Sequence, residues 1–154
     1  MRMMSPSKGS MTIEEIVLDI KQYIDESTVP VEIVVGSDSQ NTNETKFVSV
    51  VAIHRQGQGG RFFYSVSRQK LITNLRLKIY RETQMTLDLA KELTAIMIEN
   101  EIFNSVVIHA DLGTEGKSKE LINEIKGWVI SEGYEIFIKP QCYAASAIAN
   151  MISK

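Results

Sequence analysis

Residues 31–40 of the chain read VEIVVGSDSQ, a β-branched run that ends in a polar segment containing Asp38. A second apolar run, residues 105–110 (SVVIHA), also leads directly to an aspartate, Asp111. Short β-branched runs bounded by turn residues predict buried strands. If these strands lie side by side and parallel, both carboxylates fall at the carboxyl edge of the sheet, where α/β folds usually bind ligands. An aspartate after a strand also commonly begins a turn or caps a helix, so neither residue alone establishes a site.

The segments around these two runs predict an α/β fold. Residues 46–55 and 61–68 read as strands joined by a glycine-rich tip, so with the first run they predict an antiparallel meander. Helical spacing of apolar residues predicts the helices, and a last apolar run predicts one more strand. The expected helices cover residues 12–26, 74–100, 118–132 and 144–152, and the expected last strand covers residues 134–138. We therefore expect a five-stranded mixed sheet, three antiparallel strands and then two parallel ones, flanked by helices.

Length and composition restrict the possible classes of protein. A chain of 154 residues predicts one domain, which we place at residues 12–154, with residues 1–11 as a flexible tail. One cysteine and two histidines exclude a disulfide framework and every multi-cysteine zinc site, so a catalytic metal would need oxygen ligands. No apolar stretch reaches the roughly 20 residues that span a bilayer, and no export signal is seen. We expect a cytoplasmic protein with no membrane partner.

A third carboxylate, Glu82, breaks the apolar stripe of the expected helix at residues 74–100. The stripe comprises Leu75, Ile79, Thr86, Leu89, Leu93 and Ile96, and Glu82 completes its spacing. A carboxylate on a face that packs against a sheet costs several kcal/mol unless a cation compensates it. Pairing with Arg76, Lys78 or Arg81 is one possible compensation, and a metal ion is the other. Three acids from two strand ends and one helix suit Mg²⁺ or Mn²⁺, which prefer oxygen ligands.

Basic residues are concentrated in one segment. Residues 45–81 hold eight Lys and Arg and no acid, although the whole chain has a net charge of −2. Such a block predicts a locally basic surface with a polyanion as its ligand, or else a sheet whose edge charges are simply solvated. The residues that we expect to bind nucleic acid are Arg55, Arg61, Arg68, Lys70 and, from a later loop, Lys117.

The element order and several short motifs resemble the ribonuclease H-like superfamily. The motifs are residues 36–40 (GSDSQ), 109–111 (HAD), 116–118 (GKS), and 139–140 (KP) followed by 144–146 (AAS). More narrowly, they resemble a family of small bacterial proteins of unknown function with that fold. The resemblance covers residues 31–154, with the helix at residues 12–26 as an addition. It implies a two-metal nuclease site in which Asp38 bridges the ions and Glu82 and Asp111 complete the cluster.

One departure from that pattern leaves two functions open. Nucleases of the superfamily usually carry a fourth acid near the last helix, whereas no Asp or Glu follows Glu135 in this chain. Asn150 could bind a hard cation through its amide oxygen, but it adds no negative charge. The sequence therefore predicts a divalent-metal-dependent nuclease, and leaves as its alternative a non-catalytic module that binds nucleic acid or protein on the same fold.

Overall fold

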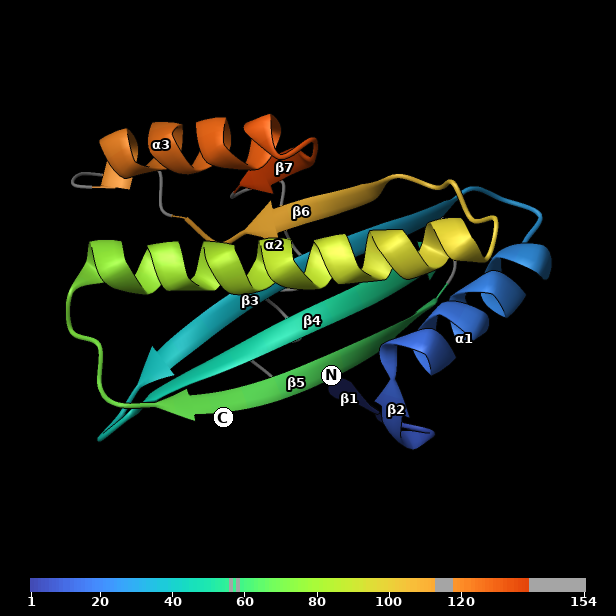
Figure 1. Cartoon of the computed structure of the whole chain (residues 1–154), viewed down its shortest axis with the longest axis horizontal. Coiled ribbons are helices and arrows are strands. Elements are labelled where there is room, and N and C mark those ends of the chain that lie inside the picture. Colours follow the sequence, from blue (N-terminus) through green and yellow to red (C-terminus); the bar gives the residue numbers. More distant parts are fainter. Residues whose placement is uncertain (56, 58, 113–117, 139–154) are drawn as a thin grey trace.

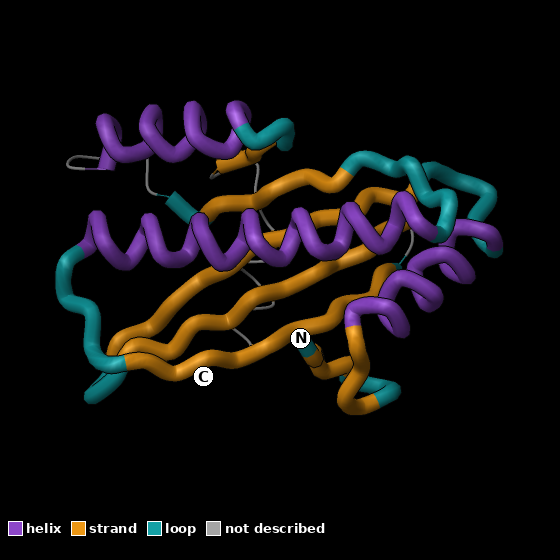
Figure 2. The backbone as a smooth tube through the Cα atoms, viewed as in Figure 1, coloured by secondary structure: helices purple, strands orange, loops and turns teal. Residues whose placement is uncertain are grey.

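A computed structural model describes residues 1–55, 57, 59–112 and 118–138 as a seven-stranded mixed sheet with helices on one face (Figure 1). The strand order is β2-β1-β5-β4-β3-β6-β7. Figure 2 shows the described helices on the same side of the strands. The predicted α/β class with a mixed sheet is therefore confirmed, although the sheet has more strands than the five expected.

The central strands pair as the sequence predicts. The antiparallel meander consists of β3 (Val31–Asn41), β4 (Thr45–Arg55) and β5 (Gly60–Gln69). On the other side of β3, β6 (Val106–Ala110) pairs with it in parallel, and β7 (Glu135–Ile138) pairs in parallel with β6. The parallel neighbours follow helical crossovers, as parallel strands require. The sheet thus changes from antiparallel to parallel at β3.

The helices begin and end at the residues that their local chemistry favours. They are α1 (Ile13–Asp25), α2 (Leu75–Glu99) and α3 (Ser118–Ser131). Thr12 and Glu15 form the predicted capping box, with hydrogen bonds of 3.1 and 3.0 Å. After α3, Gly133 adopts a φ of 94°, which favours glycine. Among the described helices, none combines the length and apolar character needed to cross a bilayer. The helix expected at residues 144–152 and the loop at 113–117 lie outside the described residues.

The flexible tail predicted for residues 1–11 is wrong. Residues 2–12 instead form a hairpin of β1 (Arg2–Ser5) and β2 (Gly9–Thr12), which extends the sheet beyond β5 through the pair Met4–Tyr64. Met3 and Met11 face each other across this hairpin and are both buried. The segment is mostly polar in composition, but burial of these two methionines gives it an apolar contact with the core.

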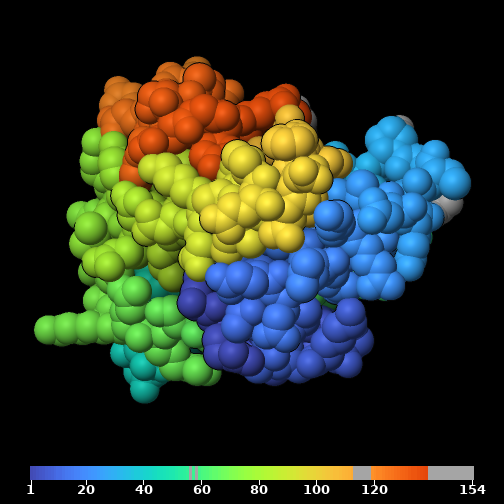
Figure 3. All heavy atoms as spheres, turned by 45° about the vertical axis from the view of Figure 1, so that its right-hand side comes forward, coloured from blue at the N-terminus to red at the C-terminus, as the bar shows by residue number. Residues whose placement is uncertain are grey.

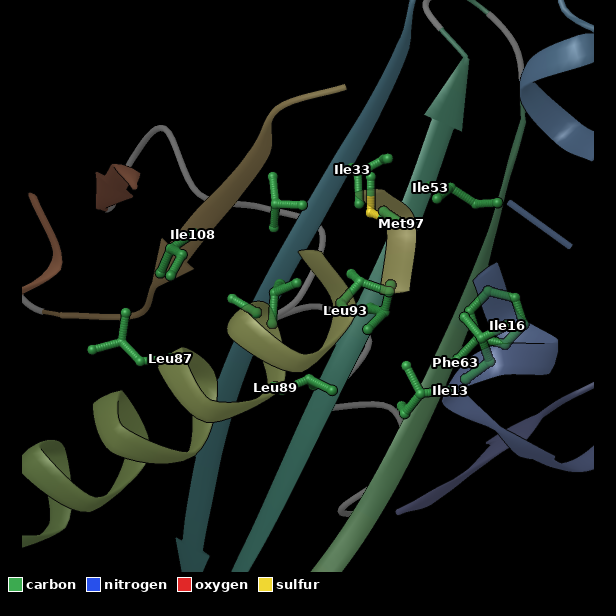
Figure 4. Close-up of a cluster of buried hydrophobic side chains, with 14 of the residues drawn as sticks. Ile13, Ile16, Ile33, Ile53, Phe63, Leu87, Leu89, Leu93, Met97 and Ile108 are labelled. Carbon is green, nitrogen blue, oxygen red and sulfur yellow. The ribbon is translucent and has the colours of Figure 1, made fainter. Parts of the chain in front are cut away.

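Alternation along the strands divides the core between the two faces of the sheet. Ile33 and Val35 lie in the main cluster under the helices, whereas Val34 lies in a second cluster on the opposite face. Figure 4 shows the main cluster, in which Leu89 and Leu93 of α2 lie over the strands. Odd-numbered residues of β3 therefore face the helices, and even-numbered residues face away from them.

A buried acid ties the hairpin to the rest of the molecule. The side chain of Asp19 on α1 is only 3% exposed, and its Oδ1 accepts hydrogen bonds from Lys8 Nζ at 3.0 Å and Arg61 Nη1 at 2.5 Å. Lys8 comes from the hairpin turn and Arg61 from β5. Figure 3 shows the hairpin and α1 (blue) forming one continuous surface with α2 (yellow). Asp19 therefore joins three segments that are distant in sequence.

Replacing Asp19 should destabilise this N-terminal region. Asp19→Asn leaves two cations beside a neutral amide, and we expect the free energy of unfolding to fall by about 1–3 kcal/mol. Chemical denaturation measures the change. Asp25→Asn is the matched control, because Asp25 is an exposed acid on the same helix. Equal stability of the two variants would contradict the role assigned to Asp19.

Candidate functional site

The pairing of β3 with β6 places the two aspartates next to each other in the sheet. The last pair in this parallel register is Ser37 with Ala110, and the next residue along each chain is Asp38 and Asp111. In Figure 1, β3 and β6 both point toward the left of the view, where α2 begins. The two carboxylates therefore lie at the carboxyl edge of neighbouring parallel strands, which is the arrangement that the sequence predicts.

The third acid, Glu82, is held against this edge by α2. It lies one turn after Ile79 and one turn before Thr86, both of which are buried. Glu82 itself is partly buried, and its Oε1 accepts a 2.6 Å hydrogen bond from the hydroxyl of Ser39. Ser39 has an odd number in β3, so its side chain faces α2. The apolar packing of the helix thus brings a carboxylate to the polar end of β3.

The charge of Glu82 is unfavourable in this position. Burial, and then the nearby charges of Asp38 and Asp111, raise the pKa of Glu82 from 4.5 to about 7, although the Ser39 hydrogen bond and Lys78 oppose the change. Desolvation and like charges both disfavour an ionised carboxyl group. Raised pKa values of this kind, produced by burial and specific charged neighbours, are common at functional sites.

A small cavity lies beside Glu82 and Asp111, between β6, α2 and α3. Its volume is about 20 Å³, and its lining includes Glu82, Asp111, Ser37 and Thr83. A cavity of this size holds about one water molecule. Thr83 already donates its hydroxyl to the carbonyl of Ile79 at 2.8 Å. The hydroxyl of Thr83 is therefore already bonded within α2.

The three acids suit a divalent cation by their chemistry, but they do not converge on one point. Among residues 1–55, 57, 59–112 and 118–138, no three Asp, Glu, His or Cys side chains are close enough to ligate one metal ion. Strand alternation explains part of this result, because Asp38 lies opposite Val48 on the face away from the helices. The structure brings the carboxylates into electrostatic range of one another without forming a common ligation point.

The predicted nucleic-acid-binding residues separate into two groups. Arg55 pairs with Val31 across the sheet, seven residues from Asp38, which corresponds to about 23 Å along the strand. Arg61 lies near the same end, opposite Ile53. By contrast, Arg68 lies at the end of the sheet that holds Asp38. Arg68 pairs with Lys46 of β4, and on its other side Lys46 pairs with Gln40 of β3, which is two residues from Asp38.

Most of these arginines also have acidic partners. Arg61 binds Asp19, and Arg68 binds Glu44 at 3.1 Å. Arg55 lies 3.9 Å from the centre of the Tyr23 ring and donates to the Tyr23 carbonyl at 3.0 Å. Lys70 is exposed directly after β5. Two further predicted site residues, Lys117 and Asn150, lie outside the described residues.

Ser39 is the site residue that the sequence analysis missed. The same alternation that assigns Ile33 and Val35 to the buried face also assigns Ser39 to it. Continuing the period-two alternation past the apolar residues would therefore have predicted that Ser39 faces the helices. It was concealed because Ser39 lies beside Asp38 in a segment that reads as a turn.

A mixed sheet with acids at the carboxyl edge of its neighbouring parallel strands defines a known class of protein. The family described as Ribonuclease H-like matches residues 15–154, and the chain belongs to this family. A relative from Bacillus subtilis (strain 168), the uncharacterized protein YkuK, is 26% identical over 166 aligned positions. The alignment covers 96% of this chain and 94% of YkuK. The resemblance seen in the sequence is thereby confirmed at the level of fold and family.

The raised pKa of Glu82 predicts how the stability of the metal-free protein depends on pH. The folded protein keeps a proton up to about pH 7, whereas the unfolded chain releases it near 4.5. The free energy of unfolding should therefore fall as the pH rises from about 4.5 to about 7. Glu82→Gln should remove this decline. Since one pKa unit corresponds to about 1.4 kcal/mol, a pKa raised from 4.5 to about 7 should make the variant more stable than the parent by roughly 3 kcal/mol at pH 8.

Denaturation at several pH values, in the presence of a chelator, measures this difference. Glu99→Gln is the matched control, because Glu99 is an exposed glutamate near the other end of the same helix. Parent and Glu82→Gln proteins should be equally stable at pH 4. A parent protein whose stability is constant from pH 4.5 to 8 would show that Glu82 is not strained.

Proposed function

We propose that the chain is a divalent-metal-dependent nuclease that hydrolyses phosphodiester bonds in nucleic acid. Asp38, Glu82 and Asp111 would hold Mg²⁺ or Mn²⁺ at the carboxyl edge of β3 and β6. The observation that carries this proposal is the partly buried Glu82 with two aspartates in electrostatic range, because a cation relieves the repulsion that raises its pKa. Membership of the Ribonuclease H-like family also supports the proposal of a nuclease.

The chain's own residues have separate tasks in this proposal. Asp38 and Asp111 present carboxylates from two strands that the sheet holds rigidly, and Glu82 presents a third from α2. A bound divalent ion would supply Lewis-acid stabilisation of charge on a phosphate and would lower the pKa of a water molecule. The side chains would need to turn toward one another to reach a common ion. Mutual repulsion of the carboxylates adds to the separation that strand alternation already gives Asp38.

Cations at the same end of the sheet are suited to phosphate. Lys70 follows β5, and Lys78 lies close enough to Glu82 to lower its pKa. Among the described residues, neither lysine has an acid within ion-pair distance, unlike Arg61 and Arg68. Lysines of this kind bind the backbone of nucleic acid without reading its sequence. They would place a phosphodiester near the acids.

A binding module without catalysis is the second candidate. The observation that favours it is the lack of any Asp or Glu after Glu135, since a second metal ion would then gain little charge stabilisation. The two functions share the fold and the basic residues. They differ in whether cleavage accompanies the binding of metal.

Asp38→Asn should abolish divalent-dependent cleavage while the protein remains folded. The parent protein should melt at a higher temperature when Mn²⁺ is added, because a ligand that binds only the native state stabilises it. The variant should show a much smaller shift. Thermal melting with and without Mn²⁺, beside cleavage assays on single-stranded, duplex and hybrid substrates, tests both statements. Asp88→Asn, at an exposed acid of α2, is the control.

Each result of that experiment favours one of the two functions. A melting shift with cleavage supports the nuclease. A melting shift without cleavage favours the binding module and makes Asn150→Asp the next change to test. A parent protein with neither response to Mn²⁺ would refute the metal-dependent nuclease.

Nucleic-acid binding should weaken as salt increases, and the lysines near the acids should set part of that dependence. Each phosphate contact contributes a slope of about 0.7–0.9 in log affinity against log salt. Replacing Lys70 and Lys78 together with Ala should lower the slope by roughly 1–2. Arg61→Ala, at the far end of the sheet, should leave it unchanged. Fluorescence anisotropy with a labelled single strand measures the slopes, and an unchanged slope in the double variant would locate the binding surface elsewhere.

A further inference from the structure

Apolar side chains are exposed at the start of α2 and in the loop just before it. Leu71, Leu75 and Leu77 are 41%, 49% and 53% exposed, although all three lie within one stretch of seven residues. Single exposed leucines are common on protein surfaces, but several together indicate a binding surface. Glu82 lies on the same helix, less than two turns after Leu77. A ligand of this surface would therefore lie close to the proposed nuclease site.

A groove of about 450 Å³ opens beside Leu77. Its other lining residues are Asn74, Arg76 and Tyr80. Residues four apart in a helix lie one above the other on its surface, so Arg76 and Tyr80 form one row and Leu77 begins a second row that continues with Arg81. Pockets that bind small molecules have volumes of roughly 300–1,000 Å³. The groove is therefore large enough for a planar ring of the size of a nucleobase.

The wall formed by Arg76 and Tyr80 is held in place by α3, which lies alongside the first half of α2 (Figure 1). The guanidinium carbon of Arg76 lies 5.2 Å from the centre of the Tyr80 ring, and this ring stacks on Trp128 of α3 at a centre-to-centre distance of 5.5 Å. Glu124 of α3 accepts hydrogen bonds from Arg76 Nη2 and from the Tyr80 hydroxyl. Guanidinium planes and aromatic rings are the surfaces on which proteins stack unpaired bases. The wall is therefore preorganised for contact with a base.

Charges around the groove favour phosphates on one side of it only. Glu120 and Glu124 of α3 both act on Arg76, so the side of the groove next to α3 repels a phosphate. On the side of α2 away from α3, Lys78 and Arg81 have no ion-pair partner within the part of the chain that the structure describes. A basic track beside a stacking surface is the arrangement that binds single-stranded nucleic acid. Such a strand would place its phosphates along Lys78 and Arg81 and its bases in the groove.

We propose that this groove, lined by Asn74, Arg76, Leu77 and Tyr80, binds the bases of single-stranded nucleic acid. The inference rests on the proposed nuclease function and adds the class of its substrate. In a duplex each base is paired and stacked within the helix, so its flat faces are not accessible to the groove. The chain should therefore bind a single strand more tightly than a duplex of the same sequence.

The test measures the affinity of three labelled DNA ligands by fluorescence anisotropy at low salt, with a chelator present to prevent metal-dependent cleavage. The ligands are a single strand, the same sequence as a duplex, and a single strand of equal length whose sugar-phosphate backbone lacks bases. The parent protein should bind the normal single strand most tightly. Since contact with one base contributes about fivefold or more in affinity, the abasic strand should bind at least about fivefold more weakly.

Leu77→Ser should remove this preference, because it takes away an apolar wall of the groove without removing a charge. Its affinity for the normal strand should fall about fivefold, whereas its affinity for the abasic strand and its salt dependence should not change. Arg76→Lys, which keeps the charge and loses the planar group, should act in the same direction. Leu77→Phe, which keeps an apolar wall, should retain the preference. Ile98→Ser is the matched control, since Ile98 is 54% exposed near the other end of α2.

The outcomes distinguish this inference from the proposed function. If the parent binds the normal and abasic strands equally well, or if Leu77→Ser binds like the parent, the base-binding groove is refuted while the nuclease stands. If the parent binds no nucleic acid at low salt, both are refuted together. If sedimentation shows that the parent self-associates and that Leu77→Ser is a monomer, the exposed leucines serve contact between copies of the chain, and the inference is refuted.

Discussion

β3 is hydrogen-bonded on both sides, antiparallel to β4 and parallel to β6, and these two registers determine where the acids lie. A slip of one residue would move every side chain of the strand to the other face of the sheet. Ile33 and Val35 fill the core under the helices and Val34 fills the opposite cluster, so such a slip would disrupt two cores at once. The apolar residues of β3 therefore determine the register of the strand, and the register determines which way its polar residues face. It sets Asp38 beside Asp111 and aims Ser39 at α2.

The packing of α2 imposes the unfavourable position of Glu82. The helix has 25 residues and lies across the sheet, with Leu87, Leu89 and Leu93 buried along it. These leucines determine its rotation, and the rotation turns Glu82 toward β3 whether or not a cation is present. The favourable contacts of Glu82 with Ser39 and Lys78 do not offset burial and the two aspartates, because the pKa still rises to about 7. The fold thus tolerates a local cost that its core could have avoided with an apolar side chain, which is typical of a site kept for function.

Much of the fold and two features of the site could be predicted from the sequence because they depend on local patterns. The strand runs that end at Asp38 and Asp111 and the broken stripe at Glu82 are visible in windows of a few residues. The N-terminal hairpin was missed because strands of four residues carry almost no periodicity, and its stability comes from Asp19 and β5. The distribution of arginines was missed for a similar reason. Their acidic partners, Asp19 and Glu44 among them, are assigned by the fold and not by sequence distance.

These ion pairs leave a particular distribution of charge. Asp19 neutralises cations at the end of the sheet that is far from the acids, where Lys8 and Arg61 meet it. Near the acids, by contrast, Lys70, Lys78 and Arg81 have no ion-pair partner among the described residues. Positive charge without local compensation therefore gathers beside three carboxylates. Lys78 lowers the pKa of Glu82 without an ion-pair contact, and burial and the two aspartates still keep that pKa raised. A metal ion for the acids and a phosphate for the lysines would compensate both sets together, and the fold holds the two sets at the same edge of the sheet.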